Sequence, residues 1–129
     1  MIRPLSRILY VEDDPDIQEV ARLALEAVGG FVVRVCGSGA EALQEAAGFG
    51  PDLILLDVMM PGMDGPTTLA MLRQLPAIAA TPVVFMTAKV QPREVIEFQQ
   101  LGALDVVFKP FDPMSLPGEL QAIWERHRE

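Results

Sequence analysis

Carboxylates, a threonine and a lysine stand where strands of this sequence are expected to end. The clearest case is Asp57, which follows the apolar run 53–56. This run is too short for a buried helix and suits a strand covered on both faces. Residues 61–65 contain a proline, two glycines and an aspartate, a composition typical of turns. Because open α/β sheets place ligand sites at the carboxyl ends of their strands, we interpret Asp57 as a reactive or metal-bound carboxylate.

Other expected strand ends supply more polar groups, namely Glu12 and Asp13, then Thr87, then Lys109. In a parallel sheet with right-handed crossovers, these ends lie along one edge. Three carboxylates at that edge need a compensating cation or proton. A divalent ion and Lys109 together would balance them, and hard oxygen ligands favour Mg²⁺. A zinc site is not indicated, because the only histidine is His127, near the chain end.

Such a set suits phosphoryl transfer to a carboxylate. Catalysis of that reaction is mostly positioning and neutralisation of charge on three equatorial oxygens. Mg²⁺ would take one oxygen, Lys109 a second, and the Thr87 hydroxyl or a backbone N–H the third. Asp57 would be the nucleophile and would become an aspartyl phosphate.

Strand-like and helix-like segments alternate along the chain and would position these residues. The expected strands are 7–11, 31–35, 52–57, 82–87 and 105–108. The expected helices are 15–28, 38–47 (beginning at Ser38 or Gly39), 66–75, 92–101 and 117–127. This alternation predicts an α/β fold, a single doubly wound parallel sheet with five helices on both faces. No internal repeat or linker interrupts it, so we expect one domain over residues 1–129.

Composition narrows the classes of function. The net charge of −8, from ten basic and eighteen acidic residues, argues against unaided binding to nucleic acid. No apolar run has the length of a membrane span, and the first residues lack a signal-peptide core. The single cysteine, Cys36, is expected to pack as a small hydrophobe. A cytoplasmic protein is the default expectation.

Four motifs together resemble the receiver domains of bacterial two-component response regulators, including the chemotaxis receivers. The motifs are Glu12-Asp13, the segment 57–65 (Asp-Val-Met-Met-Pro-Gly-Met-Asp-Gly), Thr87-Ala88 and Lys109-Pro110-Phe111. The resemblance covers essentially the whole chain. It implies a flavodoxin-like sheet of order 2-1-3-4-5, an order that the receiver fold itself exemplifies.

The resemblance also implies roles for individual residues. Asp57 accepts phosphate from the phosphohistidine of a sensor histidine kinase or phosphotransfer protein, and Thr87 and Lys109 engage the phosphoryl group. Glu12, Asp13, Asp57 and the backbone carbonyl of Met59 arrange Mg²⁺. The Lys109-Pro110 bond is expected to be cis. The domain would promote only its own phosphorylation and dephosphorylation, and would signal to a downstream protein target without binding nucleic acid or membrane.

One position departs from the family pattern. Receivers usually carry Tyr or Phe three residues before the lysine, and here that residue is Val106. Phe108 lies on the same strand face by alternation but is not assumed to replace it. The usual aromatic switch is therefore in doubt, whereas the bond-making residues are unaffected.

Simpler readings exist for several of these residues. Asp14 and Asp16 are expected to be helix-capping and first-turn acids, a role that would also suit Asp13 taken alone. The methionines 59, 60 and 63 are expected to pack in their loop. Lys89 either borders the site or is a solvated loop lysine.

Other functions compete with that of a phosphoacceptor. A pseudo-receiver would act as an interaction module without phosphate. A haloacid-dehalogenase-like phosphatase would use the pattern Asp14-Pro15-Asp16, which fits poorly because Pro15 begins a helix. An FMN-binding flavodoxin is disfavoured by the acidic residues after the first strand. A stand-alone regulator, a phosphorelay shuttle and a fragment of a longer regulator all fit the sequence.

Overall fold

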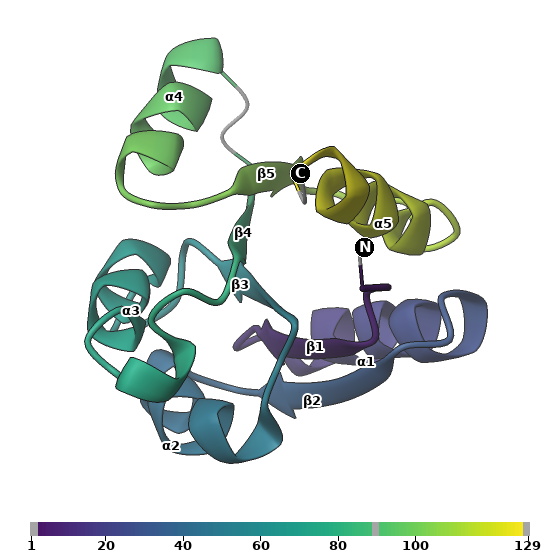
Figure 1. The fold of residues 1–129 in the computed structure, drawn as a ribbon. Coiled ribbons are helices and arrows are strands. Elements are labelled where there is room, and N and C mark those ends of the chain that lie inside the picture. Colours follow the sequence, from purple (N-terminus) through teal and green to yellow (C-terminus); the bar gives the residue numbers. More distant parts are fainter. Residues whose placement is uncertain (1–2, 89–90, 128–129) are drawn as a thin grey trace.

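A five-stranded sheet forms the centre of the computed structural model, which describes residues 3–88 and 91–127 (Figure 1). The strands are β1 (Arg7–Val11), β2 (Val32–Cys36), β3 (Leu53–Asp57), β4 (Val83–Thr87) and β5 (Asp105–Phe108). They pair in parallel in the order β2-β1-β3-β4-β5. This confirms the predicted fold class and strand order.

Helices cover both faces of the sheet. They are α1 (Pro15–Leu23), α2 (Gly39–Phe49), α3 (Gly65–Leu72), α4 (Pro92–Gln100) and α5 (Leu116–Arg126). Alternate side chains of the buried strands enter two separate apolar cores. One core includes residues of α2 and α3, and the other includes residues of α1 and α5. In the two described ranges, no helix combines the length and hydropathy needed to cross a bilayer.

Aspartates cap the start of α1, which follows β1, and the start of α3, which follows β3. The Asp14 carboxylate accepts hydrogen bonds from the backbone N–H groups of Asp16 and Ile17 at the start of α1. The Asp64 carboxylate accepts one from Thr67 N–H, 2.9 Å away, at the start of α3. These caps satisfy N–H groups that the helix itself leaves unpaired. They fix where each loop turns away from the sheet edge.

Element boundaries differ from the sequence-based expectation in a few places. The first α-helix ends at Leu23 and continues as the π-helical turn η1 (Ala24–Val28). The third helix ends at Leu72 rather than residue 75, and a 3₁₀ turn, η2 (Pro76–Ile78), follows it. Residue-by-residue hydrophobic spacing does not distinguish a π or 3₁₀ turn from the end of an α-helix, which explains these differences.

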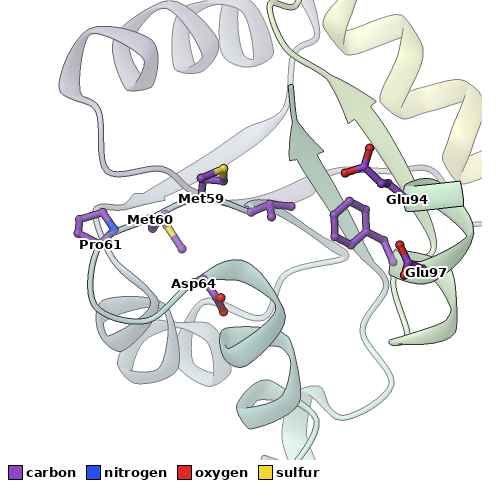
Figure 2. Close-up of a pocket in the computed structure, with 8 residues that line it drawn as sticks. Met59, Met60, Pro61, Asp64, Glu94 and Glu97 are labelled. Carbon is purple, nitrogen blue, oxygen red and sulfur yellow. The ribbon is translucent and has the colours of Figure 1, made fainter. Parts of the chain in front are cut away.

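The α4 helix contains no buried residue and contacts the rest of the domain through few apolar side chains. Its half-buried Val95 and Phe98 pack against the core on that face. The Phe98 ring meets the Phe85 ring edge-to-face, with centroids 5.2 Å apart. Across a groove, α4 faces the loop that joins β3 to α3 (Figure 2).

Candidate functional site

Asp57 is the last residue of β3, a strand that is buried along its whole length. The backbone N–H of the next residue, Val58, bonds to the Met86 carbonyl of β4, 3.1 Å away. The loop then folds back, and Gly65 N–H bonds to the Val58 carbonyl at 2.9 Å. A Cβ atom on Gly65 would lie only 2.7 Å from the Asp57 carbonyl oxygen. Glycine at this position therefore lets the loop close tightly beneath the aspartate.

Glu12 and Asp13 follow β1 and meet Asp57 at the sheet edge, as predicted. One carboxylate oxygen from each of the three residues lies within 4.8 Å of the other two. Glu12 is 1% and Asp57 3% exposed, whereas Asp13 is exposed to solvent. The Glu12 carboxylate also accepts a hydrogen bond of 3.1 Å from Asp14 N–H. Two of the three carboxylates are thus fixed inside the protein and the third borders solvent.

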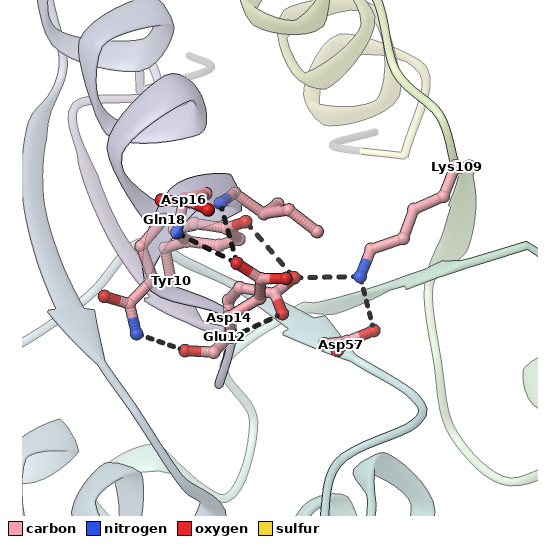
Figure 3. Close-up of polar contacts among 8 residues, drawn as sticks. Tyr10, Glu12, Asp14, Asp16, Gln18, Asp57 and Lys109 are labelled. Atoms are coloured by element: carbon pink, nitrogen blue, oxygen red, sulfur yellow. Dashed lines mark hydrogen bonds and ion pairs between the residues drawn. The ribbon is translucent and has the colours of Figure 1, made fainter.

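Lys109 brings a positive charge to this cluster from the end of β5. Its ammonium group lies 2.8 Å from Glu12 Oε1 and 3.0 Å from Asp57 Oδ1 (Figure 3). Its backbone N–H bonds to the Thr87 carbonyl, 2.8 Å away. The Lys109-Pro110 peptide bond is cis, as expected. One lysine therefore contacts two of the predicted site carboxylates at once.

Burial and ion pairing shift the pKa values of Glu12 and Lys109 in opposite directions. Burial raises the pKa of Glu12 above its usual range, although the Lys109 hydrogen bond opposes that shift. Burial lowers the pKa of Lys109, but hydrogen bonds to Glu12 and Asp57 outweigh it, so the net shift is upward. Lys109 accordingly remains charged at neutral pH and serves as the counter-charge of the cluster.

Two supporting residues were missed by the sequence analysis. Tyr10 is fully buried, and its hydroxyl lies 3.5 Å from Glu12 Oε1 (Figure 3). Burial, followed by the charge of Glu12, raises its pKa. The side-chain amide of Gln18, on α1, donates to the Glu12 backbone carbonyl. Strand alternation, which puts residues 10 and 12 on one face, was the available signal for Tyr10.

The remaining predicted site residues lie along the same edge. Thr87 is the last residue of β4, is buried, and pairs in register with Phe108 of β5. Met59 follows Asp57 by two residues, and its side chain is 69% exposed. Its carbonyl as a metal ligand stays a prediction, as do the roles of the other residues. Lys89 lies outside the described residues.

The residues present suit a hard divalent cation. Three carboxylate oxygens converge, and two of them come from buried side chains, where uncompensated negative charge is costly. Mg²⁺ is commonly held by a few carboxylates with water completing its octahedral shell. The exposed position of Asp13 leaves an open side toward solvent. These three residues, Glu12, Asp13 and Asp57, are called the triad, and they can bind a metal.

Other sequence-based expectations are also resolved. Asp14 caps α1 and Asp16 is exposed in its first turn, so neither joins the triad. Met60 packs in the core as expected, but the Met59 side chain does not, because the loop directs it into solvent. Val106 is buried, whereas Phe108 is 45% exposed.

Comparisons with known proteins agree with this geometry. Residues 8–121 match the family described as Response regulator receiver domain. The chain is 38% identical over 124 residues to the DNA-binding response regulator MtrA of Mycolicibacterium smegmatis, covering 96% of this chain and 53% of MtrA. It is 36% identical to the transcriptional regulatory protein CseB of Streptomyces coelicolor, covering 94% of this chain and 50% of CseB. The chain thus spans about half the length of these curated relatives.

Solved structures show the same architecture. The chemotaxis response regulator CheY4 of Vibrio cholerae superimposes with a TM-score of 0.84 at 29% identity, covering 92% of this chain and 98% of that one. A putative response regulator from Chloroflexus aurantiacus gives a TM-score of 0.82 at 35% identity, covering 96% of this chain and 100% of its own.

Proposed function

Because this chain belongs to the response regulator receiver domain family, we propose that Asp57 accepts a phosphoryl group from a phosphohistidine. A receiver domain is a signalling module rather than a conventional enzyme, and receiver domains are partners of histidine kinases. The observation that supports the assignment most directly is the Lys109 ammonium group, which touches both Asp57 and Glu12. It stands where negative charge would accumulate during transfer to Asp57.

In the proposed reaction, an Asp57 carboxylate oxygen attacks phosphorus as the P–N bond to the donor imidazole breaks. The electron pair of that bond remains on the imidazole nitrogen. The Lys109 ammonium would donate to one oxygen of the transferred group and the Thr87 hydroxyl to another. Bound by Glu12, Asp13, Asp57 and the Met59 carbonyl, Mg²⁺ would supply further neutralisation of charge. Hydrolysis of the acyl phosphate by water would return the domain to its starting state.

An apolar pocket of about 430 Å³ beside Lys109 offers a surface on which a donor protein could pack. Ile17 and Val20 of α1 form one side, and Pro110 and Phe111 form the other. Val20 is exposed, so the pocket opens to solvent next to the site. We propose that the protein carrying the phosphohistidine packs here, which would place its imidazole near Asp57. To test this, a set of phosphorylated histidine kinases is screened as donors. Val20→Asp should slow phosphoryl transfer from the active kinases but should not slow phosphorylation by acetyl phosphate.

The proposed output is a change in the face formed by Thr87, α4, β5 and α5. Movement of Thr87 toward the phosphoryl group would be transmitted to α4, which follows it in the chain and contains no buried residue. Val106 supplies no aromatic ring, and Phe108 already lies exposed on that face. Switching would therefore depend on α4 rather than on an inward-swinging ring of β5.

We propose that residues 1–129 act as one receiver domain in the cytoplasm and signal through a downstream protein. The net charge of −8 supports a protein contact rather than contact with nucleic acid or membrane. The DNA binding named for MtrA belongs to a protein of about twice this length, and we do not assign it to these residues.

The test is intact mass after incubation with acetyl phosphate, with and without Mg²⁺. Wild type should gain the mass of one phosphoryl group only with Mg²⁺, and Asp57→Asn should gain none. Asp16→Asn is the matched control, because it removes an exposed carboxylate of α1 outside the triad and should leave the adduct intact. A wild-type protein that gains no mass from acetyl phosphate or from phosphohistidine donors would contradict the proposal. That result would instead indicate a pseudo-receiver that acts through contacts alone.

A further inference from the structure

A second concave surface lies between α4 and the loop that follows Asp57. This groove has a volume of about 670 Å³. Its loop side consists of Val58, Met59, Met60, Pro61 and Asp64, and its helix side of Glu94, Glu97 and Phe98. Figure 2 shows Glu94 and Glu97 on α4 opposite the loop residues Met59, Met60 and Pro61. The groove begins at Val58 and Met59, directly after Asp57, but none of the three triad carboxylates lines it, and it shares no residue with the apolar pocket beside Lys109.

Apolar groups form the floor of this groove. Val58 and Met60 are buried and Phe98 is half-buried against Phe85, so these side chains are held in place. Met59 differs, because 69% of its surface is exposed. A methionine side chain is flexible and polarizable and adapts to the shape of an incoming apolar group. The floor therefore offers fixed apolar surface beside one adaptable side chain.

Acidic residues lie on the loop side and on the helix side of this apolar floor. Among the described residues that line the groove, Asp64, Glu94 and Glu97 are acidic and none is basic. Glu97 is exposed on α4, and Asp64 is exposed at the start of α3. Their fields add at the groove and favour a cationic ligand. The combination of an apolar floor and an acidic rim is selective for a ligand that presents both an apolar group and positive charge.

We propose that this groove is a docking site for a basic segment of a protein partner. An arginine or lysine of the segment pairs with Glu97, and an apolar side chain of the segment packs against Met59 and Phe98. Charge complementarity selects the class of partner, because nucleic acid and anionic lipid are repelled by the carboxylates of Asp64 and Glu97. The volume accommodates several side chains rather than a single ion.

This docking goes beyond phosphoryl transfer and does not require it. It is therefore tested on Asp57→Asn as well as on wild type. The probe is a synthetic heptapeptide that alternates arginine and leucine, added to ¹⁵N-labelled protein at low salt. We expect saturable amide shifts for residues 58–64 and for α4 in both proteins. Raising the salt concentration should weaken the binding, since exposed charges are screened.

Matched variants assign the contacts. Glu97→Gln should weaken binding roughly two- to fivefold, as expected for an exposed ion pair. Glu119→Gln removes an exposed carboxylate on α5, which packs on the opposite face of the sheet, and should leave affinity unchanged. Met59→Ser should weaken binding roughly tenfold through lost apolar contact.

Several outcomes would overturn the proposal. One is the absence of groove shifts at millimolar peptide, and another is a set of shifts confined to residues 12–14. Equal binding of a glutamate–leucine peptide would show that charge does not select the ligand. Spermine binding with the same affinity and the same shifts would indicate a site for small cations instead of a protein segment.

Discussion

The ammonium nitrogen of Lys109 lies 3.0 Å from a carboxylate oxygen of Asp57, although the two residues are 52 positions apart. The same nitrogen is 2.8 Å from Glu12, which extends from the end of another strand. Lys109 therefore neutralises part of a carboxylate cluster that would otherwise repel itself. A divalent ion bound at the triad would share these carboxylates with the lysine.

Removal of the Lys109 charge is expected to tighten metal binding and slow phosphorylation. Lys109→Met leaves Glu12, Asp13 and Asp57 without their cation, so their affinity for Mg²⁺ should rise by roughly tenfold, or ~1.4 kcal/mol. The same change removes the proposed donor to the transferring phosphoryl group and should slow adduct formation. Calorimetric Mg²⁺ titration and intact mass against time measure the two effects.

Lys109→Arg is the control for charge. It should keep Mg²⁺ affinity within about twofold of wild type, because the positive charge is retained. Weaker Mg²⁺ binding in Lys109→Met would show that the lysine positions the carboxylates more than it competes for them.

Gly65→Ala should disturb the loop beneath Asp57. The new Cβ would lie 2.7 Å from the Asp57 carbonyl oxygen and 2.8 Å from Val58 Cα, and both are backbone atoms that cannot rotate away. We expect a loss of about 1–3 kcal/mol in the free energy of unfolding, as for other overpacked sites. Urea denaturation followed by Trp124 fluorescence measures it.

Gly118→Ala is the matched control, because a Cβ there meets no atom within 4 Å and the residue lies in α5. That variant should be stabilised by up to about 1 kcal/mol through helix propensity. Equal effects of the two substitutions would contradict the steric argument at Gly65.

Most of the fold could be predicted from the sequence, because apolar runs and the glycines and prolines that interrupt them act locally. The residues 53–56, all apolar, marked the central strand, and glycines or prolines marked the ends of the helices. Strand order then placed Glu12, Asp57 and Lys109 at one edge, where the structure brings them together.

Features that depend on packing between distant segments were beyond that reasoning. The contact of Phe98 with Phe85 depends on how α4 packs against the sheet, and so does the groove beside it. The spacing of residues along the sequence does not specify this packing. The exposure of Met59 depends in the same way on the path of its loop. The position of Tyr10 in β1 predicts a core residue, and only the contact of its hydroxyl with Glu12 links it to the site.

The α4 helix is expected to open before the rest of the domain. Its apolar attachment consists of the half-buried Val95 and Phe98. Elements with little buried apolar surface exchange their amide hydrogens at a low opening free energy. Phe98→Ala should speed exchange in α4 and should lower the global free energy of unfolding by only about 1–2 kcal/mol, less than for a fully buried phenylalanine.

Hydrogen exchange resolved by helix provides the measurement, with Leu72→Ala as the control. Leu72 is fully buried in α3, so its truncation should cost about 2–5 kcal/mol and should speed exchange in all helices together. If Phe98→Ala also speeds exchange in all helices equally, α4 is not an independent unit.

Cys36 is expected to make the fold sensitive to alkaline pH. Burial raises the pKa of its thiol from 9.0 to about 12. The folded protein then keeps a proton that the unfolded chain loses, so the thiol's contribution to stability is complete below pH 9. It declines as pH rises toward 12, by about 1.4 kcal/mol per pH unit. Burial also raises the pKa of Tyr10, which adds a loss of the same sign at higher pH.

Urea denaturation at several pH values from 7 to 11 measures this dependence. Cys36→Ala should show a shallower loss of stability above pH 9 than wild type, because one fewer group releases a proton on unfolding. Tyr10→Phe should have its effect mainly above pH 10, and the two variants should match wild type in slope between pH 7 and 8. Equal slopes above pH 9 in Cys36→Ala and wild type would show that the thiol does not govern alkaline stability.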